Sequence, residues 1–165
     1  MILSANMNQQ HAALMTLLQT INASILLIQE PWWGHLVPKC SDTNKDGVKT
    51  KGTGSHPSWR TITPPWNTDS PDPHMAIFIQ NDITATITYS ILSQMTSYTC
   101  IGFCLDTEPP LFIINYYHHV IDHRSSLEHL TNLPLPAGPL IIGNDFNTHS
   151  PCWSPPDLTM SPWAP

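Results

Sequence analysis

A short stretch near the N-terminus, ILLIQEPW at residues 25–32, decides the fold. Its apolar part, Ser24 to Gln29, predicts a strand covered on both faces, since near-continuous apolar runs are typical of strands buried between two layers. The strand ends in Glu30-Pro31. The carboxylate of Glu30 is therefore expected to lie at the edge of the core, where a buried strand ends.

Two further apolar runs end in polar residues in the same way. Leu140-Ile141-Ile142 predicts a buried strand that runs into Gly143-Asn144-Asp145-Phe146-Asn147, and Leu111 to Asn115 predicts a strand that runs into Tyr116-Tyr117. Polar groups at strand ends are the usual way to build a site in an α/β fold. Glu30 and Asp145 are the best-placed carboxylates, and Mg²⁺ requires oxygen ligands of this kind.

The remaining apolar patterns predict an alternation of strands and helices around these runs. One helix is expected where Leu14, Leu17, Leu18 and Ile21 form a single apolar stripe, with Asn8 as its N-cap. The other expected elements are strands at Ile2 to Asn6, Met75 to Gln80, Ile83 to Tyr89 and Tyr98 to Leu105, and a short helix at Ser125 to Thr131. The order predicts an α/β sandwich with antiparallel strands in its middle.

The region from Pro38 to His74 has no hydrophobic period and is rich in Gly, Ser, Thr, Pro and Lys, so it predicts a long irregular loop. Five of the six basic residues fall within it: Lys39, Lys45, Lys49, Lys51 and Arg60. A solvated loop is one interpretation. A phosphate-contacting loop beside an acidic site is the other.

The composition predicts one globular domain, because 165 residues with 41% hydrophobic content can bury a core. The net charge of −6 has the wrong sign for a protein that coats DNA by bulk electrostatics. Cys100 and Cys104 lie four apart in an expected strand, so they predict buried thiols on one face rather than a disulfide framework.

The N-terminal residues turn polar at once, and no apolar run is long enough to cross a membrane. We therefore expect an intracellular protein, with the nucleus as one candidate compartment, and no membrane partner.

The two quoted stretches resemble motifs of the endonuclease/exonuclease/phosphatase superfamily. ILLIQEPW resembles its strand with a metal-binding Glu, and LIIGNDFNTHSPCW at residues 140–153 resembles its GDFN motif. The pair is most similar to the endonuclease domains of non-LTR retrotransposons. Asn6-Met7-Asn8 and Ile114-Asn115-Tyr116-Tyr117 resemble two further motifs in the expected order.

The resemblance implies a four-layered α/β sandwich, with two packed mixed β-sheets flanked by helices, spanning residues 1–165. It also implies hydrolysis of DNA phosphodiesters with Mg²⁺, or alternatively Mn²⁺, as cofactor. Glu30 would hold the metal, and Asp145 would orient and deprotonate the attacking water. Asn147 would hydrogen-bond the phosphate, while Tyr117 and Asn6 would position the phosphate and the carboxylates.

Two departures from the family pattern bear on activity. Asn144 stands where the family motif has Gly, a mild change because Asn tolerates left-handed backbone. No Ser-Asp-His occurs in the sequence, although the family ends with this motif after further core strands. We therefore expect a fold that is incomplete at its C-terminus and an impaired enzyme.

Other residues near these motifs have two interpretations each. His118, His119 and His123 follow Tyr117 and could mark a transition-metal site, although loop histidines without set spacing are more often surface residues. His149 lies close to the GDFN-like motif. Trp32, Trp33 and Trp153 could stack on bases or cap the core.

Three hypotheses remain open from the sequence. The chain is an active or impaired Mg²⁺-dependent phosphodiesterase on DNA, a catalytically inactive remnant of a mobile element, or a binding module that grips nucleic acid through the basic region from Lys39 to Arg60. Nuclease and phosphatase activities are not separated by the motifs, because one fold supports both. The oligomeric state, the sequence preference and the nature of the C-terminal end also stay open.

Overall fold

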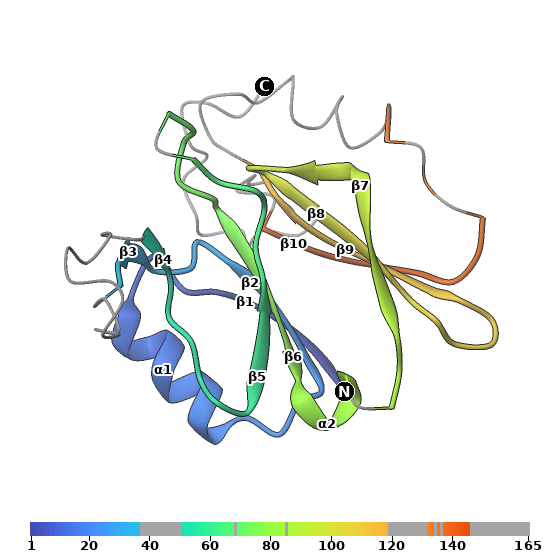
Figure 1. Ribbon diagram of the computed structural model, residues 1–165, viewed down its shortest axis with the longest axis horizontal. Helices are drawn as coiled ribbons and strands as arrows, with labels where there is room; N and C mark the ends of the chain where they lie inside the picture. The colour runs from blue at the N-terminus through green and yellow to red at the C-terminus, as the bar shows by residue number, and fades with distance from the viewer. Residues whose placement is uncertain are drawn as a thin grey trace, which may run out of the picture.

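The computed structural model describes residues 1–36, 51–67, 69–84, 86–118, 132–133, 135 and 137–145. Within these ranges the chain forms two four-stranded sheets and a small two-stranded ribbon. Figure 1 shows the two large sheets packed against each other, with the longer helix on the outer side of the first sheet.

The first sheet has the strand order β1-β2-β6-β5. Its strands are β1 (Ile2–Asn6), β2 (Ile25–Gln29), β6 (Met75–Gln80) and β5 (Trp59–Ile62). β1 and β2 are parallel, while β6 is antiparallel to both β2 and β5. Every residue of β2 is buried, as its apolar run predicts for a strand covered on both faces.

The second sheet has the strand order β10-β9-β8-β7. Its strands are β10 (Leu140–Asp145), β9 (Leu111–Tyr117), β8 (Cys100–Leu105) and β7 (Tyr89–Ser97). β10 is parallel to β9, and the other pairs are antiparallel. The expected antiparallel strands in the middle of the chain are therefore confirmed.

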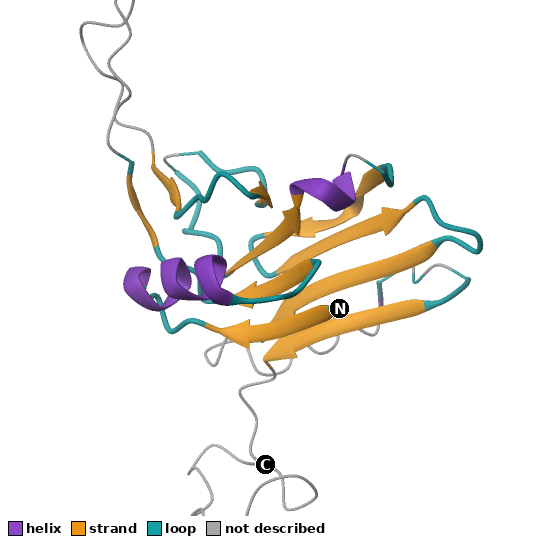
Figure 2. Ribbon diagram, turned by 90° about the horizontal axis from the view of Figure 1, so that it is seen from below, coloured by secondary structure: helices purple, strands orange, loops and turns teal. Residues whose placement is uncertain are grey.

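The helices and the ribbon complete the described elements. The helices are α1 (His11–Thr20) and α2 (Asn81–Thr84), and the ribbon pairs β3 (Trp33–His35) with β4 (Lys51–Thr53). Figure 2 shows α1 beside the first sheet and the β3–β4 ribbon standing off from the two large sheets. No helix in the described ranges has both the length and the apolar character needed to cross a membrane.

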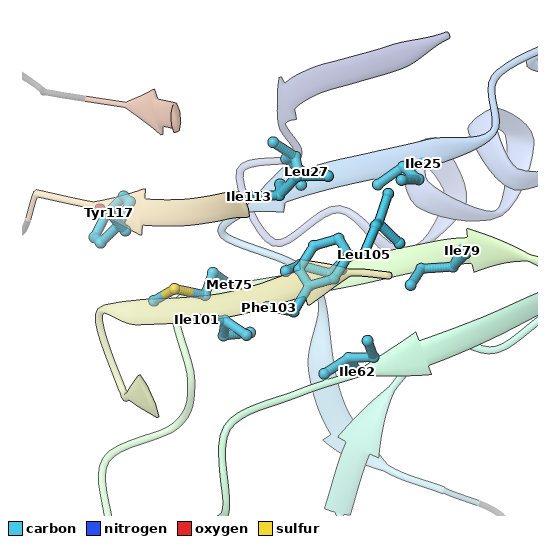
Figure 3. Packing of buried hydrophobic residues seen from close by; sticks show 11 residues of the cluster. Ile25, Leu27, Ile62, Met75, Ile79, Ile101, Phe103, Leu105, Ile113 and Tyr117 are labelled. Carbon is cyan, nitrogen blue, oxygen red and sulfur yellow. The ribbon is translucent and has the colours of Figure 1, made fainter. Parts of the chain in front are cut away.

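The core lies between the two sheets. Its side chains alternate along the strands, so that Ile101, Phe103 and Leu105 of β8 face Ile25 and Leu27 of β2 in one buried cluster (Figure 3). A second cluster lies on the other face of the first sheet, where Leu14 and Leu18 of α1 pack against Leu26, Ile28, Ala76 and Phe78. The predicted sandwich of two packed sheets with a helix outside is confirmed.

A fourth layer is not seen in the described part of the chain. The outer face of the second sheet carries a buried cluster that includes Met95, Cys100, Ile114 and Tyr116. The helix expected at Ser125 to Thr131 lies outside the described residues. The prediction of two buried thiols in this strand is confirmed for Cys100, which is buried, but only in part for Cys104, which is half-buried.

The prediction of a strand at Ile83 to Tyr89 was wrong, although this segment has the clearest alternation of apolar and polar residues in the sequence. Asn81–Thr84 is helical, and the N–H of Ile87 donates to the carbonyl oxygen of Ile83. Hydroxyl groups stabilise this helical turn, because Thr84 Oγ1 donates to the Asn81 carbonyl oxygen and Thr86 Oγ1 to that of Ile83. Side-chain bonds of this kind compete with strand pairing.

Three further expectations need correction. Gln10, not Asn8, is the N-cap of α1, and it makes no side-chain cap bond. The region from Pro38 to His74 is not all loop, because β4 and β5 lie in it. Leu140 to Ile142 does form a strand, but Ile141 and Ile142 are 37% and 40% exposed, since β10 is an edge strand in the described part of the chain.

Candidate active site

The ends of four strands meet at one place. β1 and β2 are parallel, so Asn6 is paired with Gln29 and lies beside Glu30. β9 and β10 are also parallel, and Tyr117 is paired with Asp145. The two sheets pack face to face, and side-chain hydrogen bonds from Asn6 to Asp145 and from Tyr117 to Glu30 join the C-terminal ends of both parallel pairs. They form a cluster of Asn6, Glu30, Tyr117 and Asp145, which is called the polar cluster below.

Asn6 joins the two carboxylates of the polar cluster. Its side-chain Nδ2 donates to Glu30 Oε2, at 3.1 Å, and also to Asp145 Oδ2. Its Oδ1 accepts a hydrogen bond from the backbone N–H of Asn8, at 2.7 Å, which fixes the orientation of the amide. One amide group therefore holds two carboxylates from opposite ends of the sequence.

Glu30 adopts a left-handed backbone conformation with φ 44°. Such a conformation costs roughly 1–2 kcal/mol for a residue other than glycine, so the surrounding contacts must stabilise it. Its N–H donates to the carbonyl oxygen of His74 at 2.7 Å, and its own carbonyl oxygen accepts from Gln9 at 2.8 Å. Strained backbone that is held by its neighbours is typical of functional sites.

Tyr117 completes the contacts of Glu30. Its hydroxyl donates to Glu30 Oε1 at 2.8 Å, so each carboxylate oxygen of Glu30 accepts one hydrogen bond from the polar cluster. The Tyr117 ring is buried and stacks on the imidazole of His74, with a centroid distance of 4.9 Å and an interplanar angle of 12°. His74 and Glu30 also line a small pocket together with Gln9, Trp33 and Asp72.

A buried amide network lies beneath the polar cluster and connects the two sheets. Gln29 Nε2 donates to Asn115 Oδ1 at 2.6 Å. Asn115 Nδ2 donates to the carbonyl oxygens of Ile28 and Ala76, both at 3.0 Å. Both amides are almost fully buried. The network fixes β9 against β2 and β6 close to Glu30, which follows Gln29 in the chain, and to Tyr117, which comes shortly after Asn115.

The model of the endonuclease/exonuclease/phosphatase family matches residues 2–164, which is almost the whole chain. The chain belongs to the endonuclease/exonuclease/phosphatase family. A search of curated proteins finds no match.

Among solved structures, the chain is similar to the endonuclease domain of TRAS1, a telomere-specific non-LTR retrotransposon. The TM-score is 0.58 with 20% sequence identity, and the match covers 92% of this chain and 61% of that one. The likeness shows a shared fold. The chain spans about three fifths of the length of this relative.

The polar cluster suits a hard divalent cation of the kind on which nucleases of this family typically depend. Glu30 and Asp145 present carboxylate oxygens to the same amide nitrogen, and Mg²⁺ is usually bound by one or two carboxylates, with waters and substrate phosphates as its other ligands. The described residues contain no group of three His, Cys, Asp or Glu that could hold a metal.

The structure brings together four of the five residues that the motifs suggested: Asn6, Glu30, Tyr117 and Asp145. The fifth, Asn147, lies outside the described residues, as do His119, His123, His149 and Trp153. His118 is not a surface residue, because its side chain is fully buried and its N–H donates to the Asp145 carbonyl oxygen at 3.1 Å.

The basic residues that can be placed make contacts within the chain. Lys51 forms an ion pair with Asp72 at 3.4 Å and lies over the Trp66 ring, while Arg60 lies over the Tyr89 ring. Lys39, Lys45 and Lys49 lie outside the described residues.

Asn144 is an ordinary strand residue without positive φ. The tolerance of Asn for left-handed backbone therefore does not explain why Asn stands where the family motif has Gly.

Sequence reasoning missed His74. The residue follows Pro73 at the end of a region interpreted as irregular, and it precedes the apolar strand Met75 to Gln80. Its position before a buried strand was the only signal, because its contact with Tyr117 is long-range.

Proposed function

We propose that the chain is a divalent-metal-dependent phosphodiesterase that acts on DNA, in the manner of a retroelement endonuclease. One observation carries the proposal: the carboxylates of Glu30 and Asp145 both accept hydrogen bonds from Asn6 Nδ2, at an edge where two parallel strand pairs end. Family membership supports phosphodiester chemistry, and the similarity to a retrotransposon endonuclease domain supports DNA as the substrate.

Each residue of the polar cluster has a role in this proposal. Glu30 would hold the metal ion, and a bound ion would supply charge neutralisation at the scissile phosphate. Asp145 orients the attacking water and takes its proton, as a carboxylate within hydrogen-bond reach of a water does in general base catalysis. Asn147 contacts the phosphate, as its place in the family motif implies.

Tyr117 and Asn6 position the two carboxylates. The Tyr117 hydroxyl holds Glu30 Oε1, and the Asn6 amide holds Glu30 Oε2 and Asp145 Oδ2. Hydrogen bonds to a ligating carboxylate fix its orientation and typically affect metal affinity or activity by about 10–100-fold. Mg²⁺ is the expected ion, and Mn²⁺ is expected to replace it.

The test is nicking of supercoiled plasmid in the presence of Mg²⁺ by the chain and by the isosteric variants Glu30→Gln and Asp145→Asn. Both variants should lose nicking. Glu108→Gln is the matched control, because Glu108 is exposed in the turn before β9, at the opposite end of this strand from Tyr117. Nicking that persists in both site variants would overturn the proposal.

A binding titration of Mn²⁺ followed by electron paramagnetic resonance provides a readout without catalysis. The wild-type chain should bind Mn²⁺, and Glu30→Gln should weaken that binding. A folded wild-type chain that neither nicks DNA nor binds Mn²⁺ would instead support an inactive remnant of a mobile element. Cleavage of bis(p-nitrophenyl) phosphate but not p-nitrophenyl phosphate would separate diesterase from phosphatase activity.

The binding-module hypothesis has less support. Lys51 and Arg60 interact with Asp72, Trp66 and Tyr89 of the same chain, and the net charge of −6 opposes bulk phosphate binding. DNA binding that weakens with salt but survives EDTA would favour it over the phosphodiesterase.

A further inference from the structure

His74 is tied to both sheets through its backbone. Its N–H donates to the carbonyl oxygen of Tyr98, which lies between β7 and β8 of the second sheet, at 3.2 Å. Its carbonyl oxygen accepts from the N–H of Glu30, which follows β2 of the first sheet, at 2.7 Å. His74 therefore spans the junction of the sheets directly beside the left-handed residue that carries the Glu30 carboxylate.

The imidazole ring of His74 makes a separate contact. It stacks on the ring of Tyr117 at a centroid distance of 4.9 Å and an interplanar angle of 12°. Tyr117 in turn donates its hydroxyl proton to Glu30 Oε1 at 2.8 Å. A flat ring on one face of the phenol restricts its rotation, and offset-stacked aromatic pairs are stabilising beyond their buried area.

We propose that His74 is a positioning residue, whose ring holds the Tyr117 phenol in the plane from which its hydroxyl reaches the Glu30 carboxylate. This inference rests on the proposed function for its catalytic consequence. Its structural content, the coupling of the His74 ring to the Tyr117–Glu30 hydrogen bond, does not. The contact of Glu30 with the His74 backbone is separate from the ring, so it survives in any His74 variant that keeps the fold.

The variants that test the inference are His74→Ala, which removes the ring, and His74→Phe, which keeps a flat ring of similar size. His74→Ala should lower kcat for plasmid nicking by about 2- to 10-fold, the loss that corresponds to one aromatic stacking contact. KM for the plasmid should change little. His74→Phe should recover most of this loss. Equal losses in both variants would show that the stacked ring is not what matters.

A double-mutant cycle shows whether His74 acts through Tyr117. Tyr117→Phe keeps the ring and removes the hydroxyl, so adding His74→Ala to it should cause little further loss of nicking. Independent, multiplying effects would contradict the inference. The matched control is His11→Ala, which removes another imidazole packed on an aromatic ring, that of Trp32, at 4.5 Å. It should leave nicking unchanged.

A spectroscopic readout separates this inference from the proposed function. The ring-proton resonances of Tyr117, assigned by their loss in Tyr117→Phe, should shift in His74→Ala and stay near their wild-type position in His74→Phe. The Tyr117 hydroxyl proton should exchange faster with water in His74→Ala, because its bond to Glu30 is loosened. Unchanged shifts and exchange would overturn the inference. An inactive wild-type chain that shows these changes would overturn only the proposed function.

Discussion

Asn6 and Asp145 are joined by a side-chain hydrogen bond although they are separated by 139 positions in the sequence. Asn6 ends β1, the first strand, and Asp145 ends β10, the last strand of the described chain. The two strands belong to different sheets, so this bond connects the sheets at the end where their parallel pairs terminate. The polar cluster therefore depends on the packing of the whole sandwich.

The Asn6 amide should be essential for the geometry of both carboxylates. Asn6→Ala removes the donor to Glu30 and Asp145, and we expect a loss of about 10–100-fold in Mn²⁺ affinity or nicking, as for other residues that orient metal ligands. Asn6→Asp is the matched variant, because it can keep the acceptor for the Asn8 N–H while losing the donor. If Asn6→Ala nicks DNA and binds Mn²⁺ like the wild-type chain, the donated bonds have no role.

The amide network between the sheets should contribute strongly to stability. Asn115→Ala removes three buried hydrogen bonds, two to the carbonyl oxygens of Ile28 and Ala76 and one from the amide of Gln29. A buried hydrogen bond contributes about 1 kcal/mol, so the loss of three should lower the free energy of unfolding by roughly 3 kcal/mol in urea denaturation. The control Asn81→Ala removes an exposed amide bond and should cost less than about 1 kcal/mol. Similar losses in both variants would contradict this prediction.

Gly143 should be irreplaceable for a steric reason. A Cβ atom at this position would overlap Leu27 Cδ1 and lie 3.0 Å from Leu27 Cβ. Gly143→Ala should therefore displace β10 from β2, with a loss of about 1–3 kcal/mol in stability, and move Asp145 away from Asn6. Gly102→Ala is a matched control, because its Cβ would meet Met95 Cβ at 2.8 Å on the outer face. Both variants should unfold at lower temperature, but only Gly143→Ala should lose activity in its folded fraction.

The Cys100 thiol should resist alkylation. Its ionisation should also make the free energy of unfolding depend on pH in the alkaline range. Burial raises the pKa of this thiol from 9.0 to about 12, so at pH 8 iodoacetamide should modify the half-buried Cys104 before Cys100. The stability that this shift represents is fully present below about pH 9 and is lost as the pH rises toward 12, because the unfolded chain releases its proton first. The urea midpoint of Cys100→Ala should therefore fall less than that of the wild-type chain between pH 8 and pH 10. Equal falls would contradict the prediction.

The edge of the second sheet should promote association of the chain. β10 pairs with β9 on one side, and Ile141 and Ile142 on it are exposed. Exposed apolar edge strands template pairing with other chains. Ile142→Lys should therefore reduce aggregation in light scattering at equal concentration. Ile91→Lys is the matched control on the opposite edge, where β7 is already interrupted by a register shift after Leu92 and so is less able to pair. A monodisperse wild-type monomer would contradict this prediction.

Much of the fold could be predicted from apolar runs. Ile25 to Gln29, Met75 to Gln80 and Leu111 to Tyr117 are strands because each buries nearly all of its side chains between layers, and that requirement is visible in the sequence. The alternation from Ile83 to Tyr89 gave a wrong prediction, since the side chains of Thr84 and Thr86 bond to the local backbone there. β5 was missed because it is short and only Trp59 and Ile62 are buried in it.

The sequence by itself determined the strands that end in polar residues, the helix stripe from Leu14 to Ile21, and the identity of Asn6, Glu30, Tyr117 and Asp145 as candidates. Hydrophobic periodicity and local motifs carry this information within a few neighbouring residues. Only the tertiary structure decided which of these groups touch, and that His74 stacks on Tyr117 while Asn115 ties the two sheets together. These contacts join residues far apart in the chain, and their geometry is fixed by strand register and sheet packing rather than by any local pattern.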